Sequence, residues 1–232
     1  FMVKSERGLP NRSDKRIDLG YWVDRNFNSV ENTAALRLAP RLRDQIAMLP
    51  GADPLTARAH VDAIYFASTT APFADRQNAG VVAAALSLPE TISATDIGGS
   101  QRAATSALIA ALNAVKAGSS KHAVVLASEK RKAKAASSQE LSFGDGAAAL
   151  EIGSENVIAR LLGHAALTVD FVDHFRSEGE DYDYNWEERW IRDEGYSKIV
   201  PRAVKTALAD AGVAPSAIDH FVMPCPFAKL DQ

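Results

Sequence analysis

Apolar runs alternate with helix-like stretches through the middle of the chain. Residues 61–69, "VDAIYFAST", have the apolar and aromatic character of a buried strand. Residues 122–128, "HAVVLAS", are nearly all apolar, as expected for a strand inside a sheet that is covered on both faces. The same pattern predicts further strands and helices over 76–88 (helix), 90–97 (strand), 102–118 (helix, ending at Gly118) and 144–153 (a glycine turn, then a strand). This order predicts an α/β fold with a central sheet.

The pattern is weaker outside this region. Residues 1–30 are charged and have no clear period, so we expect a polar N-terminal segment in a loop or poorly ordered. Residues 154–195 are acidic and aromatic, and we expect an ordered excursion that carries surface or binding groups. Residues 31–153 would then form one α/β half, and residues 196–232 the start of a second.

A long-period repeat supports this division. Residues 42–68 and residues 204–224 share an Ala/Leu-rich helix, a glycine, a proline, an aspartate and an apolar strand. Asp62 to Phe66 align with Asp219 to Met223, so a strand is expected at both places. Self-similarity of this kind suggests two halves with the same topology, of which the second is incomplete in this chain.

The sequence "DIGGSQRAATSAL", residues 96–108, lies between a predicted strand and a predicted helix. Two glycines and a serine form a tight turn there, which is the layout of a nucleophile elbow. The residue at the tip is Gln101, whose side-chain amide is a poor nucleophile.

This elbow, the half-repeat and "SFGDGA" at residues 142–147 together resemble the thiolase superfamily. Within it the chain is most similar to the HMG-CoA-synthase-like and ketoacyl-synthase-III-like branch, which includes acyltransferases that pair with a small zinc-ribbon OB-fold partner. The resemblance covers roughly residues 50–232. It implies duplicated thiolase-like αβαβα halves and carbon–carbon bond formation or cleavage on CoA or carrier-protein thioesters. In such enzymes a cysteine at the elbow takes the acyl group, and the adjoining helix N-terminus favours its thiolate.

The chain departs from this pattern at positions where the resemblance implies catalytic residues. Gln101 stands at the position of the family cysteine, which argues against a standard cysteine acyl-enzyme. Thr69 stands at the position of the HMG-CoA synthase glutamate, which argues against a true HMG-CoA synthase. The histidine and asparagine motifs of the second half would lie beyond Gln232.

Three hypotheses for Gln101 stay open. Its amide could hydrogen-bond a thioester oxygen during a malonyl-type decarboxylation. The nucleophile could instead come from elsewhere, or the site could have lost its chemistry in a non-catalytic structural subunit of a thiolase-like heteromer. The expected substrate-binding residues around it are Ser100, Arg102, Phe143, Gly144 and Gly146.

Two surface features have alternative interpretations. The basic residues Lys130, Arg131, Lys132 and Lys134 could steer the phosphates of CoA, or belong to a solvated loop. The aromatic residues Tyr182, Tyr184, Trp186 and Trp190 suit a protein interface, an acyl-binding wall or a covering loop. We expect Cys225 and His220 to be structural, and we find no convincing metal-ligand spacing around His164 and His174.

Composition restricts the function classes further. The net charge of −3 provides no basic field for nucleic acid or an anionic membrane. The single cysteine excludes a disulfide framework within the chain, and a cytoplasmic location is expected. No apolar run approaches the roughly 18–20 residues of a membrane span. We therefore expect acyl-CoA as substrate, no permanently bound cofactor, and a homodimer or a heteromer with a thiolase-like or zinc-ribbon OB-fold subunit.

Overall fold

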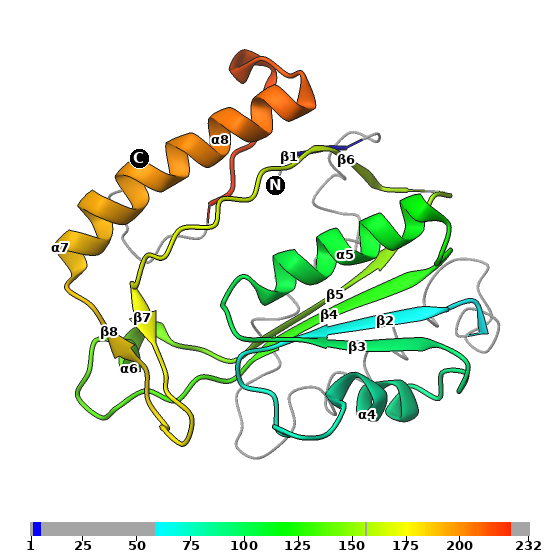
Figure 1. Cartoon of the computed structure of the whole chain (residues 1–232), viewed down its shortest axis with the longest axis horizontal. Coiled ribbons are helices and arrows are strands. Elements are labelled where there is room, and N and C mark those ends of the chain that lie inside the picture. Colours follow the sequence, from blue (N-terminus) through cyan, green and yellow to red (C-terminus); the bar gives the residue numbers. More distant parts are fainter. Residues whose placement is uncertain (1, 6–58, 156, 224–232) are drawn as a thin grey trace, which may run out of the picture. The chain divides into compact units, whose positions relative to one another are not determined.

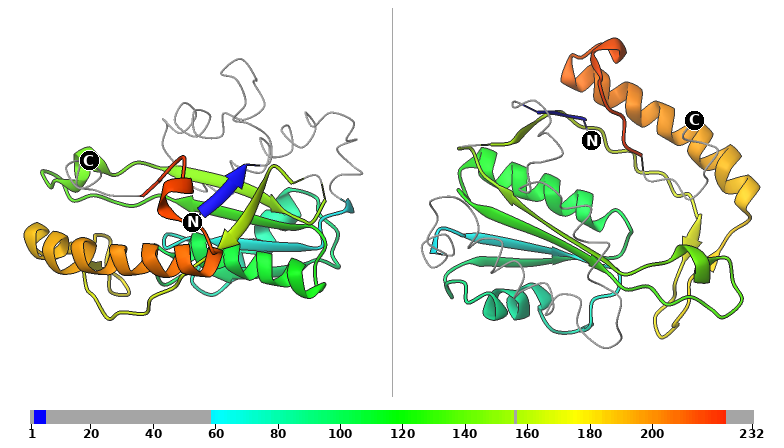
Figure 2. Two further views of the ribbon diagram at one scale, coloured as in Figure 1. Left: turned by 90° about the horizontal axis from the view of Figure 1, so that it is seen from above. Right: turned by 180° about the vertical axis from the view of Figure 1, so that it is seen from behind.

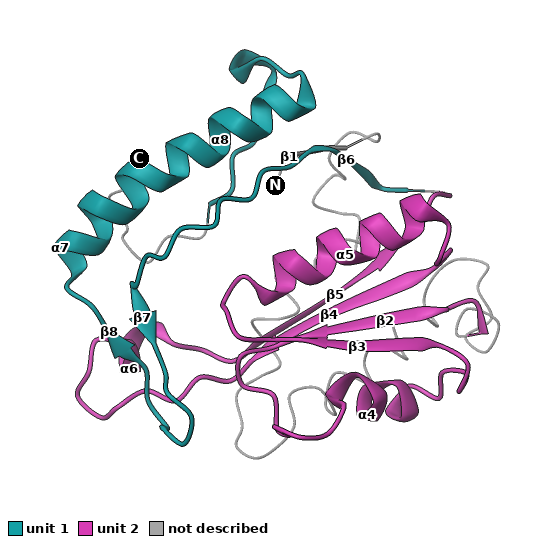
Figure 3. Ribbon diagram, in the orientation of Figure 1, with its two compact units in different colours: residues 1–13, 157–232 teal, residues 14–156 magenta. Residues whose placement is uncertain are grey.

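The computed structural model describes residues 2–5, 59–155 and 157–223 of the 232-residue chain. The chain divides into two compact units, shown in different colours in Figure 3. Unit 1 comprises residues 1–13 and 157–232, and unit 2 comprises residues 14–156. The predicted helix of the first repeat copy and Cys225 lie outside the described residues.

Unit 2 is built on a four-stranded sheet of order β3-β2-β4-β5 (Figure 1). Its strands are β2 (Ala63–Ala67), β3 (Ser93–Ile97), β4 (Ala123–Glu129) and β5 (Gly146–Ile152). β2 pairs with β3 and with β4 in parallel, whereas β5 runs antiparallel to β4. The strands expected over 61–69, 90–97, 122–128 and 144–153 are thereby confirmed, as is the central sheet.

Helices cover both faces of this sheet, as Figures 1 and 2 show. They are α4 (Asn78–Ala85) and α5 (Ala103–Ala117), and both match predicted helices. Ile64 and Phe66 point to the α4 face and pack with Val82, while the alternate residues Ala63 and Ala67 face α5. The two-residue period of a strand therefore divides the core into two layers. α5 ends at Gly118, whose positive φ of 77° fits the predicted glycine stop.

Two aspartates connect elements that are distant in the sequence. Asp96 on β3 accepts hydrogen bonds from the backbone nitrogens of Asn78 (2.7 Å) and Ala79 (2.6 Å), so it caps α4 from outside the helix. Asp62, just before β2, accepts hydrogen bonds from the Ser120 hydroxyl and from the Lys121 backbone nitrogen (2.6 Å). The hydrogen bonds to Asp96 hold the start of α4, and those to Asp62 hold the residues that lead into β4.

Unit 1 contains short strands and one long helix. β1 (Met2–Ser5) pairs antiparallel with β6 (Ala159–Gly163), and β7 (His174–Phe175) pairs antiparallel with β8 (Tyr184–Asn185). α7 (Glu188–Trp190) leads through a π-helical turn, η1 (Ile191–Tyr196), into α8 (Ser197–Ala211). The expectation of a loop over 1–30 was therefore wrong for Met2–Ser5, because β6 supplies a pairing strand that local sequence does not reveal. The described residues of the expected excursion, 154–155 and 157–195, contain β6, β7, β8, α7 and most of η1.

The end of unit 1 differs from the prediction. α8 ends at Gly212 in the left-handed region, as the glycine stop predicts. A 3-10 turn, η2 (Pro215–Ala217), follows, but no strand forms over 219–223 in the described residues. The side chains of Phe221 and Val222 are 63% and 87% exposed, and His220 is exposed as well. An apolar run becomes a strand only beside a hydrogen-bonding neighbour; in the aligned copy, β2 has one on each side.

Candidate functional site

The predicted site residues of unit 2 gather at one edge of its sheet. β2, β3 and β4 are parallel, so their carboxyl ends lie at the same edge. The loop that contains Thr69 follows β2, the predicted elbow follows β3, and Glu129 is the last residue of β4. In α/β sheets, crevices outside the carboxyl ends of the strands are the common place for ligands.

The elbow has the geometry that its sequence predicts. The chain leaves β3 at Ile97, turns at Gly98 and Gly99, and enters α5 at Ala103. Gly99 has a φ of +77°, a conformation that strains any residue with a side chain. A Cβ atom on Gly98 would lie 3.2 Å from the backbone oxygen of Ser68, so this glycine allows the turn to pass close to the β2 loop.

Ser100 joins the turn to the helix. Its hydroxyl oxygen accepts a hydrogen bond from the Arg102 backbone nitrogen at 3.1 Å, and its carbonyl oxygen accepts one from Ala103 at 2.9 Å. Gln101 and Arg102 are both exposed immediately before the first turn of α5. The amide of Gln101 therefore lies beside the positive end of the helix dipole, where it can donate or accept hydrogen bonds but cannot form an acyl-enzyme.

A carboxylate that sequence reasoning missed holds the β2 loop. The Thr69 backbone nitrogen donates to Glu129 Oε1 at 2.6 Å, and the Thr69 hydroxyl donates to Oε2 at 2.9 Å. The Thr70 hydroxyl also donates to Oε2, at 3.1 Å. The sequence shows only an acidic residue directly after a predicted strand, because the contact itself depends on β2 and β4 becoming neighbours.

The "FGDGA" motif reaches the same edge through β5. Gly146 begins β5 and pairs in register with Glu129 on β4. Phe143 is half-buried, and the Arg131 guanidinium lies over its ring at 5.0 Å from the centroid. A Cβ atom on Gly144 or Gly146 would meet no atom of the chain within 4 Å. The packing of the chain itself therefore leaves space beside both glycines.

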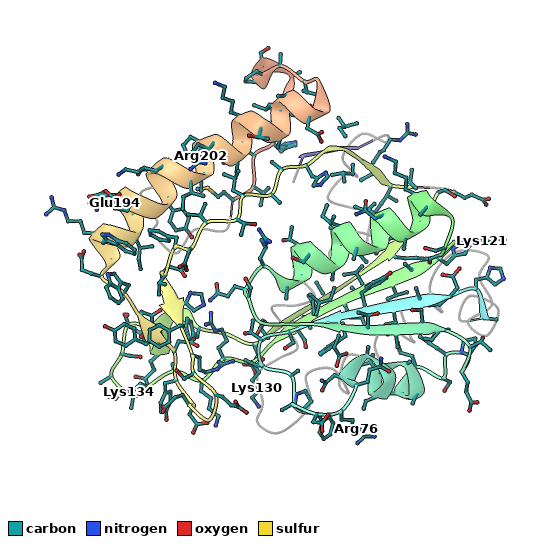
Figure 4. All side chains as sticks on the ribbon, viewed as in Figure 1. Arg76, Lys121, Lys130, Lys134, Glu194 and Arg202 are labelled. Carbon is teal, nitrogen blue, oxygen red and sulfur yellow. The ribbon has the colours of Figure 1, made fainter. Side chains whose placement is uncertain are left out.

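The basic run follows β4 in this region. The backbone nitrogen of Lys130 donates to the Thr70 hydroxyl at 2.9 Å, which ties the start of the run to the β2 loop. Figure 4 labels Lys130 and Lys134, whose side chains are exposed. Both therefore remain candidates for steering an anionic ligand.

Three of the five histidines, His122, His164 and His174, each lie beside one acidic side chain, and His60 lies beside the ring of His122. Nδ1 of His174 lies 2.8 Å from Asp173, and Nδ1 of His122 lies 3.3 Å from Glu151. No group of three or more His, Cys, Asp or Glu side chains that could hold a metal occurs in the part of the chain that the structure describes. Among the same residues, no helix is both long enough and apolar enough to cross a membrane.

Comparisons with known proteins extend these observations. No protein-family model matches the chain. It is 28% identical over 207 residues to a hydroxymethylglutaryl-CoA synthase of Methanocella arvoryzae, a match that spans 89% of this chain and 58% of that protein. The chain thus spans little more than half the length of this curated relative.

Solved structures show the same architecture. A 3-oxoacyl-[acyl-carrier-protein] synthase III from Aquifex aeolicus VF5 superposes with a TM-score of 0.66 at 20% identity, over 81% of this chain and 60% of that one. An HMG-CoA synthase solved in complex with CoA superposes with a TM-score of 0.62 at 17% identity, over 78% of this chain and 45% of that one. The chain therefore has a mixed α/β, thiolase-like fold, and it spans 60% and 45% of these two neighbours.

Proposed function

We propose that the protein acts on acyl-CoA thioesters at the carboxyl edge of the unit 2 sheet, in an acyltransferase-type reaction that forms or cleaves a carbon–carbon bond. The observation that carries this proposal is the elbow: Gly98 passes close to the β2 loop, and the turn places the exposed Gln101 just before the positive end of α5. The similarity to hydroxymethylglutaryl-CoA synthases and the CoA-bound structural neighbour support the choice of substrate class.

Gln101 restricts the chemistry available at this place. An amide cannot take an acyl group as a cysteine does, but its N–H can donate to a thioester oxygen that gains negative charge. Decarboxylation of a malonyl thioester requires no acyl-enzyme, only stabilisation of the negative charge that develops on the thioester oxygen. The bond between the carboxylate carbon and C2 breaks, CO2 leaves, and the electron pair forms an enolate whose oxygen accepts the Gln101 hydrogen bond. Water then returns a proton to C2 and gives the acetyl thioester.

The other groups of the edge have supporting roles in this proposal. Glu129 accepts three hydrogen bonds from Thr69 and Thr70, so we assign it to holding the β2 loop rather than to removing a proton from substrate. Arg102 and Lys130 are exposed cations beside the elbow and the β2 loop, and they would meet the phosphates of CoA.

Calorimetric titration of the protein with acetyl-CoA and longer acyl-CoA thioesters tests binding. We expect saturable binding that weakens when Arg102 is replaced by alanine. Failure of every acyl-CoA to bind contradicts the proposal. Incubation with malonyl-CoA then tests the Gln101 step: the unmodified protein should release acetyl-CoA, and Gln101→Ala should stop this release while acetyl-CoA still binds.

A second candidate is a non-catalytic subunit of a thiolase-like heteromer. The observation that favours it is the amide at position 101, because the only thiol of the sequence is Cys225. It predicts that the protein binds a thiolase-like subunit and turns over no CoA thioester alone. The zinc-ribbon OB-fold partner, the homodimer and the cytoplasmic location stay predictions.

A further inference from the structure

Five aromatic side chains of unit 1 form a continuous row. Phe171 stacks on Trp190, with ring centroids 4.4 Å apart and planes inclined by 8°. Trp190 lies 5.9 Å from Trp186, Trp186 lies 6.0 Å from Tyr184, and Tyr184 lies 5.1 Å from Phe175. The row brings together β7, β8, α7 and the segment before β7. Each neighbouring pair lies in the range at which aromatic rings attract one another.

The half-buried end of this aromatic row, Phe171 and Trp190, is held by its surroundings. A Cβ atom on Gly195 would come within 2.7 Å of the Phe171 ring, so that ring lies directly on the backbone of η1. The Glu187 carboxylate accepts hydrogen bonds from the backbone nitrogens of Arg189 and Trp190, each at 2.9 Å. Trp190 is therefore fixed from two sides before any ligand binds, which lowers the entropic cost of binding.

The outer end of the row is open to solvent and borders a groove. Phe175 and Trp186 are each 47% exposed, and Tyr184 is 54% exposed. A shallow groove of about 470 Å³ is lined by Asp170, Val172, Phe175, Trp186 and Trp190. Its walls are apolar and aromatic, with one carboxylate at the margin. Exposed apolar surface of this kind marks interaction sites.

The charge around the groove is strongly negative. Residues 170–194 contain ten acidic and three basic residues, whereas the whole chain has a net charge of −3. All three arginines already pair with aspartates of the same segment: Arg176 with Asp183, and Arg189 and Arg192 with Asp193. The surface therefore repels phosphates and carboxylates and attracts cations.

We propose that this groove is the docking site for a basic segment of a partner protein. An arginine or lysine side chain of that segment lies against Phe175 and Trp186, with its charge toward Asp170. Aromatic faces bind such cations, and buried contacts between tryptophan and arginine are typical of the strongest points of protein interfaces. The negative charge of the segment makes an acyl-CoA a poor occupant of the same groove, since that ligand carries several phosphate charges.

Titration of the 15N-labelled protein with an N-acetylated hexa-arginine amide tests this docking directly. Indole N–H signals of Trp186 and Trp190 are assigned with the Trp186→Phe and Trp190→Phe variants. We expect both signals to shift saturably with the peptide and to stay unchanged with hexa-glutamate.

Matched variants distinguish binding of the peptide at the groove from nonspecific attraction to the acidic surface. Trp186→Ala and Asp170→Asn alter the groove, and we expect each to weaken binding of the peptide by about 3- to 10-fold. Tyr182→Ala and Glu178→Gln alter exposed residues outside it, and we expect the Kd to change less than about twofold. Unchanged backbone amide spectra establish that each variant keeps its fold.

Three outcomes overturn the proposal. The first is the absence of saturable shifts at either tryptophan. The second is equal weakening by the groove variants and their controls, which would show nonspecific attraction to acidic surface. The third is a shift of the two indole signals with lauroyl-CoA but not with the arginine peptide, which would make the groove an acyl-binding wall. None of these readouts depends on turnover of a thioester.

Discussion

The Glu129 carboxylate accepts hydrogen bonds from both the backbone nitrogen and the hydroxyl of Thr69, 60 residues earlier in the chain. Oε1 accepts the hydrogen bond from the nitrogen at 2.6 Å, and Oε2 accepts the one from the hydroxyl at 2.9 Å. Because Glu129 also pairs with Gly146, this contact connects the loop after β2, the end of β4 and the start of β5. The shape of the proposed thioester site therefore depends on a residue that need not touch substrate.

Replacement of Glu129 by alanine should loosen the β2 loop. The donors of Thr69 and Thr70 lose a charged acceptor, so we expect the free energy of unfolding to fall by about 2–3 kcal/mol. Urea denaturation measures this loss, and the Thr69 amide should exchange faster with solvent.

A surface glutamate provides the control for this variant. Glu90 is exposed at a turn, and its replacement by alanine should change the free energy of unfolding by less than about 0.5 kcal/mol. Equal stabilities of Glu129→Ala and Glu90→Ala would show that the carboxylate contact does not hold the loop.

Asp96 gives a second prediction, because it caps α4 from β3. Asp96→Ala removes the acceptor of the Asn78 and Ala79 backbone nitrogens, and we expect a loss of about 1–2 kcal/mol of unfolding free energy. Asp96→Asn keeps one acceptor oxygen and should lose less. Thermal and urea unfolding of the three proteins checks this order of stability. An Asp96→Ala variant as stable as the unchanged protein would contradict the capping role of Asp96.

Asp62 predicts a pH dependence of stability. Burial alone would raise the pKa of its carboxyl, but hydrogen bonds from Ser120, Lys121 and His122 outweigh burial and lower that pKa below its ordinary value of 3.8. The unfolded chain therefore binds the proton first as the pH falls. The contribution of Asp62 to stability is present above the unfolded pKa and is lost as the pH drops through the lower folded value.

Urea unfolding between neutral pH and pH 3 checks this sign. The unchanged protein should lose stability more steeply below about pH 4 than Asp62→Asn, which has no proton to take up at that position. Parallel curves for the two proteins would contradict the assignment.

Much of unit 2 follows from local pattern alone. Ile64 and Phe66 alternate with smaller residues on β2, and Gly118 ends α5, so element type and order are visible in the sequence. The elbow is visible for the same reason, since Gly99 favours the positive φ that the turn needs.

The long-range contacts are not visible in this way. Glu129 and Asp96 act on backbone groups at least 17 residues away, and their partners depend on which strands become neighbours. The strand wrongly expected after Gly212 has the same cause, because a strand is defined by its neighbours as well as by its residues. The groove beside Trp186 likewise requires β7, β8 and α7 to come together before it exists.

The central claim is that the elbow presents residue 101 to an acyl thioester, and intact-mass analysis of Gln101→Cys tests it most directly. The variant is made in a Cys225→Ser background, which removes the only native thiol, and is incubated with acetyl-CoA. Glu90→Cys, at an exposed turn outside the site, is the matched control in the same background, and iodoacetamide checks that both thiols are accessible. We predict that the Gln101→Cys variant gains an acetyl adduct much faster than the control variant does. No adduct at position 101, or equal rates at both positions in folded protein, would contradict the account and favour the non-catalytic subunit.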